Sequence, residues 1–141
     1  MVVRVKLRLK YQNREVQTSA KVNSAFESED PEIILPIKLA EKLGIWPNLP
    51  EGTELGSYGT AGGWEAPAYR TPKVLEAVVI EKDRSSRVVM LRAAIMRGER
   101  EVILSDKASD EFGIELVKAG AGLWRFSGET ITRKSQKPKF W

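Results

Sequence analysis

The chain has 141 residues, of which 42% are hydrophobic and 30% are charged, and this length and composition predict one folded domain. It contains neither cysteine nor histidine, which excludes disulfides, thiolate nucleophiles and every zinc site or catalytic arrangement built on sulfur or imidazole. The net charge of +4 and the pI near 9.4 lie just within the range that suggests nucleic-acid binding.

The same composition indicates where the protein works. No run approaches the roughly 20 apolar residues of a membrane span. Charge alternates from Arg4 onward, so the beginning of the chain lacks the apolar core of a signal peptide. We therefore expect a cytoplasmic protein without membrane contact. Many lysine, arginine and glutamate residues and the absence of cysteine suggest a thermophilic source.

The chain opens with a predicted hairpin. Residues 2–11 alternate strictly between apolar and polar side chains, mostly basic, which is the period of a half-buried strand. Residues 12–14 predict a turn, and the alternation resumes over residues 16–22. A loop of small residues, Asn23-Ser24-Ala25-Phe26, and an acidic stretch over residues 27–32 follow.

A strand followed by a short helix is predicted twice. Ile33–Leu35 reads as a buried strand, and Ile37–Leu43 as a helix that begins after Pro36 and ends at Gly44. Residues 34–45 align without gaps on residues 103–114, with five identical positions. We interpret this as a twofold internal repeat, in which each half joins a hairpin to a strand-helix unit. Generic strand-helix grammar is the alternative explanation.

The remaining elements are predicted more simply. Residues 46–64 read as a long connection rich in proline and glycine, and a second hairpin joins 73–81 to 87–96. The second helix, Ser105–Phe112, has Ser105 as N-cap and follows the short strand 102–104. Two late strands cover 114–117 and 123–126. We expect a domain over 1–126 and a basic C-terminal tail over 127–141, with one strand near Thr130–Thr132.

This order of elements resembles the retropepsin-like aspartic protease family in its small prokaryotic or archaeal single-repeat form. The resemblance covers about residues 2–126. The family's Leu-Pro, Leu-Ala and Leu-Gly pairs fall on Leu35-Pro36, Leu39-Ala40 and Leu43-Gly44, and its late Ile-Leu-Gly-Arg-Asp falls on residues 103–107. The resemblance implies a mostly β fold: a closed or nearly closed acid-protease-like barrel of six to eight strands with two short helices and an internal pseudo-twofold repeat.

The resemblance also places a site, and this sequence departs from the family there. The family's Asp-Thr/Ser-Gly loop falls on Asn23, Ser24 and Ala25, and Ser105 replaces its late glycine. Family members are homodimers in which two aspartates share a proton and activate water. An asparagine amide cannot take that proton. The implied flap over the cleft spans Gly56–Gly63, and its expected binding residues are Tyr58, Gly59 and Trp64, together with Ser105.

The expected function is therefore a catalytically silent homologue that binds a peptide or protein segment in the residual cleft of a homodimer, without a metal or cofactor. One alternative is an active aspartic endopeptidase. Its acid would come from deamidation of Asn23 in the Asn-Ser pair, or from a nearby carboxylate among Glu27, Glu29, Asp30 and Glu32. The other alternative is nucleic-acid binding by the basic and aromatic residues of 133–141.

Overall fold

The computed structural model describes residues 2–59 and 62–141. Its elements in chain order are β1 (Arg4–Tyr11), β2 (Arg14–Val22), β3 (Glu32–Pro36), α1 (Ile37–Leu43), β4 (Glu54–Gly59), β5 (Glu65–Val79), β6 (Val89–Met96), β7 (Val102–Leu104), α2 (Asp106–Phe112), β8 (Ile114–Lys118), a 3-10 turn (Ala119–Ala121), β9 (Leu123–Phe126) and β10 (Arg133–Lys134). Both predicted helices are confirmed, and each ends at a glycine with a positive φ, Gly44 and Gly113.

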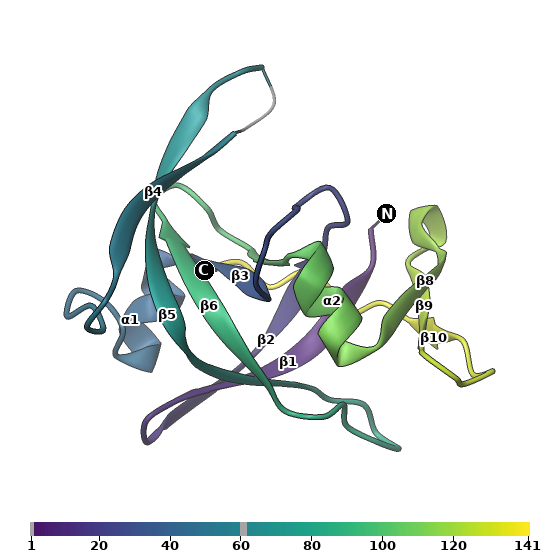
Figure 1. Cartoon of the computed structure of the whole chain (residues 1–141). Coiled ribbons are helices and arrows are strands. Elements are labelled where there is room, and N and C mark those ends of the chain that lie inside the picture. Colours follow the sequence, from purple (N-terminus) through teal and green to yellow (C-terminus); the bar gives the residue numbers. More distant parts are fainter. Residues whose placement is uncertain (1, 60–61) are drawn as a thin grey trace.

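Seven strands form one mixed sheet in the order β1-β2-β7-β3-β6-β5-β4, and a further pairing of β1 with β5 closes all but β4 into a barrel (Figure 1). The β2–β7 and β3–β6 pairs are parallel, whereas the other pairs are antiparallel. The predicted mostly β fold, a closed barrel with two short helices, is confirmed.

The barrel strands are arranged with pseudo-twofold symmetry. Their order is unchanged when β1, β2 and β7 are exchanged with β5, β6 and β3. At the centre, β3 and β7 are antiparallel, and Ile34 lies opposite Ile103. These two residues begin the sequence repeat, so the axis that relates 34–45 to 103–114 passes between them.

The barrel interior is filled by the alternating residues of the opening hairpin. Val5, Leu7 and Leu9 of β1 are fully buried, together with apolar residues of β3, β5 and β6. Burying each such side chain contributes about 1.5–3 kcal/mol to folding. The helices pack against this core through Leu39 and Leu43 of α1 and through Phe112 of α2.

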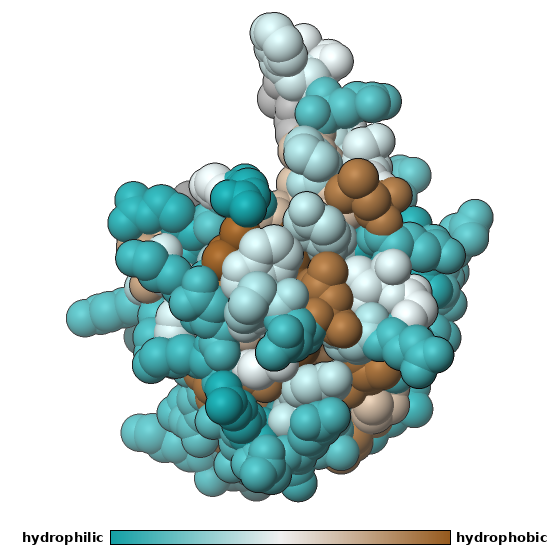
Figure 2. All heavy atoms as spheres, turned by 90° about the vertical axis from the view of Figure 1, so that its left-hand side faces the viewer, coloured by the Kyte–Doolittle hydropathy of each residue, from teal (hydrophilic) through white to brown (hydrophobic). Residues whose placement is uncertain are grey.

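One predicted connection contains a hairpin. Within residues 46–64, β4 pairs antiparallel with the first part of β5, which begins at Glu65 rather than at the predicted Lys73. This hairpin stands out from the barrel (Figures 1 and 2), and Leu55 on β4 is 70% exposed. Because much of the hairpin contacts solvent, its sequence lacks the apolar alternation that predicts a strand. Register shifts after Arg70 and Lys73 lie where β5 passes from the hairpin to the barrel.

The last strand also differs from the prediction. β10 covers Arg133–Lys134 rather than Thr130–Thr132, and it joins β9 and β8 in a second sheet. The inward residue of β10 is Arg133, a charged residue that is only 7% exposed. Sequence periodicity missed this strand because its buried position holds an arginine instead of an apolar residue.

An ion cluster joins this second sheet to the turn between β5 and β6. The Arg133 guanidinium donates to Asp83 at 2.6 and 2.9 Å and to Glu129 at 3.1 Å. It also lies 5.1 Å from the ring centroid of Phe126 and 6.0 Å from that of Trp124. Arg133 therefore holds β9, β10 and the distant turn together through both charge and packing.

Beyond β10, residues 135–141 run back along the barrel, and we name them the C-terminal strap. The Gln136 amide donates to the Arg4 carbonyl at 2.9 Å, and the Lys139 amide donates to Ser19 Oγ at 2.8 Å. Trp141 Nε1 donates to Thr18 Oγ1 at 3.0 Å, and its ring packs against the main core. The end of the chain is thus attached to β1 and β2 along its length.

Within residues 2–59 and 62–141, the helices are too short to cross a lipid bilayer.

The Arg133 cluster predicts a pH dependence of stability. The hydrogen bond from Arg133 lowers the pKa of the Asp83 carboxyl from 3.8 to about 2. A carboxyl whose pKa is lower in the folded than in the unfolded chain stabilises the fold above the unfolded pKa, and it loses this effect as the pH falls through the folded pKa. We therefore expect the thermal midpoint to fall between about pH 4 and pH 2, and to fall less in Asp83→Asn.

Thermal unfolding followed by circular dichroism over this pH range measures the effect. Asp110→Asn is the matched control, because Asp110 is exposed and forms no ion pair within the described ranges. Identical pH profiles for Asp83→Asn and the unsubstituted chain would contradict the prediction.

Candidate functional site

A cavity of about 610 Å³ lies beneath the β4–β5 hairpin, and we call it the central cleft. The loop after β2, the hairpin and the barrel strands β3, β6 and β7 each contribute part of its wall. Its lining residues are Asn23, Ala25, Phe26, Glu27, Ile34, Tyr58, Gly59, Met96, Glu99 and Ile103. Four of these, Phe26, Ile34, Met96 and Ile103, belong to a small apolar cluster separate from the main core. The cleft therefore combines an apolar floor with polar groups at its edges.

Asn23 lies at the end of β2 and shapes the loop that follows. Its backbone amide donates to the Leu104 carbonyl at 3.3 Å, and its side-chain Oδ1 accepts from the Ala25 amide at 3.1 Å. This is an Asx turn, in which a short side-chain oxygen replaces a backbone acceptor. The amide side chain is neutral, so this position brings no charge and no general base to the cleft.

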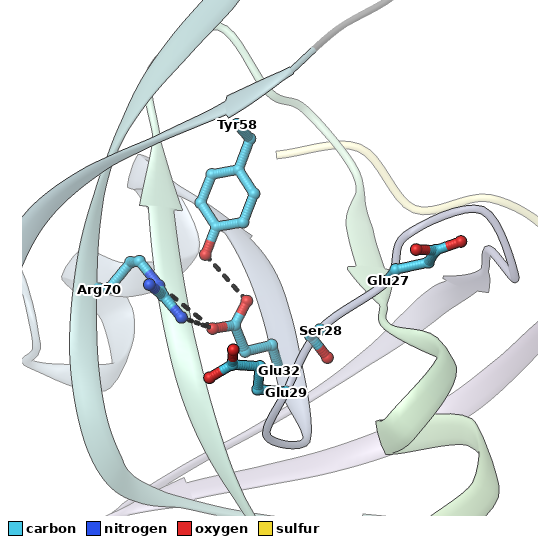
Figure 3. A pocket seen from close by; sticks show the side chains of 6 residues that line it. All are labelled: Glu27, Ser28, Glu29, Glu32, Tyr58 and Arg70. Atoms are coloured by element: carbon cyan, nitrogen blue, oxygen red, sulfur yellow. Dashed lines mark hydrogen bonds and ion pairs between the residues drawn. The ribbon is translucent and has the colours of Figure 1, made fainter.

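Tyr58 connects the hairpin to the barrel beside the cleft (Figure 3). Its hydroxyl donates to Glu32 Oε2 at 2.8 Å, and its ring meets Phe26 edge to face with centroids 5.8 Å apart. Arg70, on β5, donates through Nε to Glu32 Oε1 at 3.2 Å and also bonds it through Nη2. Glu32 on β3 thus holds two side chains that come from the two strands of the hairpin.

Burial and the hydrogen bonds to Glu32 change the pKa values of Tyr58 and Arg70. Glu32 is 1% exposed. Burial, and then the hydrogen bond to Glu32, raise the pKa of the Tyr58 phenol far above its usual value, so Tyr58 stays protonated and donates. The hydrogen bond to Glu32 likewise raises the pKa of the Arg70 guanidinium. The hydrogen bonds of Glu32 with Tyr58 and Arg70 therefore attach the hairpin to the barrel.

A second cavity, of about 500 Å³, adjoins the central cleft and shares Glu27 and Tyr58 with it (Figure 3). Its other lining residues are Ser28, Glu29, Glu32 and Arg70. Arg70 is the one basic residue lining either cavity within the described ranges, and Glu32 neutralises it. The carboxylates of Glu27, Glu29 and Glu99 therefore make the two cavities negative.

The structure brings together four of the residues predicted for the site. Asn23, Ala25, Tyr58 and Gly59 line the central cleft, from loop and hairpin respectively. Ser24 lies beside them, in a cavity of about 220 Å³ that it shares with Asn23.

The other two predicted residues lie elsewhere. Trp64 is 77% exposed on the hairpin and is not among the residues that line the two cavities. Ser105 is fully buried, where its Oγ accepts from the amides of Ala108 and Glu32 and caps α2. Ser105 therefore supports the strand that carries Glu32.

Sequence reasoning considered Glu32 only as a candidate acid and missed its pairing with Arg70. The sequence did indicate that Glu32 has a counterpart in Glu101, because Glu-Ile-Ile-Leu at residues 32–35 matches Glu-Val-Ile-Leu at 101–104. Glu101 is also buried, and it binds Arg4, with Arg4 Nη2 at 3.3 Å from Glu101 Oε2. Burial by itself raises the pKa of Glu101, but the hydrogen bond from Arg4 leaves it below its usual value.

The two buried pairs are equivalent under the pseudo-twofold axis. Arg4 lies opposite Lys21, which pairs with Ile103, just as Arg70 lies opposite Ala94, which pairs with Ile34. Each set of three strands, β5-β6-β3 and β1-β2-β7, therefore buries a glutamate at or just before β3 or β7 and bonds it to an arginine on β5 or β1. Within residues 2–59 and 62–141, only the β5-β6-β3 set has a hairpin tyrosine bonded to its glutamate.

The remaining carboxylates near the cleft are exposed or paired at the surface. Asp30 forms ion pairs with Lys73 at 3.1 Å and with Arg92 at 3.5 Å. Across residues 2–59 and 62–141, no three aspartates and glutamates come close enough to hold a metal ion. The lining of the two cavities thus presents apolar side chains and negative charge.

Comparison with known proteins identifies the class of fold. No protein-family model matches the chain, and no curated protein matches it in sequence. Among solved structures, the chain is similar to the retroviral protease-like domain of Ddi1 from Leishmania major, with a TM-score of 0.54 and 10% sequence identity. The match covers 100% of this chain and 96% of that one. The chain therefore has a retroviral protease-like fold, as the order of its motifs predicted.

Proposed function

We propose that this protein is a catalytically silent aspartic-protease-like domain that binds a peptide or protein segment in the central cleft of a homodimer. One observation carries the proposal: the neutral Asn23 amide lies on a cleft of about 610 Å³ together with hairpin residues Tyr58 and Gly59. The cleft retains the shape for a ligand, whereas the loop lacks the group for hydrolysis.

Silence follows from the chemistry of the amide. Water attacks a peptide carbonyl in this class of enzyme because a carboxylate pair holds one proton and accepts another. Two asparagines can do neither, since the amide nitrogen has no basic lone pair at useful pH. Glu32, the most deeply buried of the nearby carboxylates, has both oxygens bonded to Tyr58 and Arg70. Glu32 remains bonded to these two side chains and does not replace the missing aspartate.

Peptide binding is supported by the edge of the sheet and by the charge of the cavities. β4 is the last strand of the seven-stranded sheet, so its outer edge can pair with an extended segment. The apolar floor of the cleft accepts apolar side chains, and the carboxylates of Glu27, Glu29 and Glu99 attract basic ones. The expected ligand is an extended segment that mixes apolar residues with lysine or arginine.

The homodimer is supported by apolar side chains beside the Asn23 loop. Val2 and Leu116 line a cavity with Asn23 and Ser24, yet they are 37% and 41% exposed, as is the neighbouring Val117 at 41%. A second copy packed on this surface would remove these side chains from water and would bring the two Asn23 loops together.

The experiment that tests this function compares the unsubstituted chain with Asn23→Asp. We expect no cleavage of an unfolded protein by the unsubstituted chain between about pH 3 and pH 5. We also expect a lysine-containing extended peptide to bind more tightly than the same peptide with glutamate in place of lysine, because the cleft is negative. Fluorescence anisotropy measures binding, and sedimentation of the same samples measures the number of copies.

Asn23→Asp is the matched variant, since it exchanges an amide for a carboxylate of nearly the same shape. Acquired cleavage in this variant would show that the carboxylate alone is missing. Cleavage by the unsubstituted chain, blocked by a statine-type inhibitor, would contradict the proposed silence. Tighter binding of the glutamate peptide would contradict the proposed ligand.

A further inference from the structure

A third cavity, of about 280 Å³, lies between the C-terminal strap and the outer face of β1 and β2. It is separate from the central cleft and shares no lining residue with it. Its walls are polar and basic, and they come from the two ends of the chain. The lining residues are Lys6, Gln17, Thr18, Ser19, Gln136, Lys137 and Lys139.

The charges around this cavity are all positive. Lys6, Lys137 and Lys139 are exposed, and within the described ranges none of the three forms an ion pair, whereas Arg4 and Arg8 on the same strand are paired with Glu101 and Glu15. No carboxylate lines the cavity. Three lysines therefore line the cavity, with the Lys139 ammonium also 4.6 Å from the ring centroid of Trp141, and an anion in the cavity would be attracted to them.

Uncharged donors are present in the same walls. Ser19 Oγ accepts from the Lys139 amide, which leaves the hydroxyl hydrogen of Ser19 available to a ligand. The amide groups of Gln17 and Gln136 supply further N–H donors. Thr18 is already used, because its hydroxyl donates to the Ser19 carbonyl and accepts from Trp141. Ammonium groups, a hydroxyl and amides together form a suitable site for an oxyanion such as phosphate.

An exposed aromatic ring on the same strap indicates the source of the phosphate. Phe140, the residue after Lys139, is 55% exposed, and the Arg100 guanidinium lies 5.2 Å from its ring centroid. An exposed ring next to a basic groove is the arrangement on which bases stack in proteins that bind single-stranded nucleic acid. An acidic peptide would use the lysines equally well, but it gives the exposed ring no role.

We propose that the strap cavity binds a phosphate of single-stranded nucleic acid while a neighbouring base stacks on Phe140. This site is independent of the central cleft and does not require peptide binding. The expected contacts are with the backbone and with an unpaired base.

The test measures binding of a fluorescein-labelled single-stranded oligothymidine of about 15 nucleotides to the full chain by fluorescence anisotropy. One neutralised phosphate predicts that the affinity falls about threefold between about 50 and 200 mM salt. We expect Lys6→Ala/Lys137→Ala/Lys139→Ala to lose most of the binding and most of this salt dependence. Phe140→Ala should weaken binding about tenfold with an unchanged salt dependence.

Matched controls distinguish binding at this site from a general effect of the net charge. Lys82→Ala/Lys107→Ala/Lys118→Ala lowers the net charge of +4 by the same three units, at exposed lysines that do not line the cavity, and it should retain binding. Ile131→Ala removes an apolar side chain of similar exposure, 53%, and should also retain it.

Three outcomes would overturn the proposal: equal loss of binding in both triple variants, no binding by the unsubstituted chain at low salt, or tighter binding of polyglutamate than of the oligonucleotide. Deletion of the strap is not the right variant. It would also remove Trp141 from the core and would confuse binding with folding.

Discussion

Replacing Glu32 with alanine is expected to lower the free energy of unfolding by about 3 kcal/mol. The carboxylate is 1% exposed and accepts hydrogen bonds from Arg70 and Tyr58, which lie on the two strands of the hairpin. Its removal leaves the Arg70 guanidinium and the Tyr58 hydroxyl without their acceptor. The Arg70 side chain is 31% exposed, so water replaces part of the lost bond and the loss stays at the low end of the range for a broken buried pair.

Chemical denaturation monitored by tryptophan fluorescence measures this change. Glu29→Ala is the matched control, because Glu29 lines the same cavity but is exposed, and such substitutions usually stay within about 0.5 kcal/mol. Tyr58→Phe removes only the hydroxyl bond and should cost about 1 kcal/mol. Equal stabilities of Glu32→Ala and Glu29→Ala would show that the pair does not hold the hairpin.

Local patterns predicted the barrel well where each residue's environment depends on its neighbours in sequence. The alternation of β1 appears directly in the burial of Val5, Leu7 and Leu9. Both helices end at the predicted glycines, because a left-handed residue closes a helix and glycine adopts that conformation without strain. These elements are specified by period and by capping, and both can be read from a single sequence.

Elements that depend on distant residues could not be predicted in this way. The solvent-exposed faces of β4 give no period, and the hairpin that β4 forms with β5 was implied only by the family resemblance, as a flap over Gly56–Gly63. Glu32 is bound by Arg70, a residue 38 positions away, and no local pattern relates the two. Part of the site could still be predicted from the sequence, because the order of motifs assigned both Asn23 and Tyr58 to the cleft.

A departure from the pseudo-twofold symmetry distinguishes the β5-β6-β3 side of the barrel, which lies under the hairpin, from the β1-β2-β7 side. Both sides bury an equivalent glutamate-arginine pair, Glu32 with Arg70 and Glu101 with Arg4. Only the hairpin before β5 extends the first pair toward a cavity, through Tyr58. On the β1-β2-β7 side, Glu101 has Lys21 as its additional partner, with Lys21 Nζ 3.5 Å from Glu101 Oε2. The same structural pair therefore supports the roof of a cleft on one side and only the barrel wall on the other.

Replacing Arg133 with alanine is the second change with a large expected effect, a loss of about 3 kcal/mol in the free energy of unfolding. The side chain is 6% exposed and packs against Trp124 and Phe126, so alanine leaves a void and removes the arginine partner of Asp83. Glu129 also loses this bond and keeps its ion pair with Arg84. The strap follows directly after β10, and we therefore expect its amide hydrogens to exchange faster.

Urea unfolding and hydrogen exchange together test this prediction. Arg125→Ala is the matched control on the same sheet, because Arg125 is 43% exposed and its pair with Glu115 lies at the surface. Exposed pairs contribute little to stability, so this variant should unfold close to the unsubstituted chain. If both arginine variants lost the same stability, the second sheet would be held by its backbone pairing alone. If instead only Arg133→Ala loosened the strap, the buried guanidinium would stabilise the attachment that the strap makes through its own hydrogen bonds to β1 and β2.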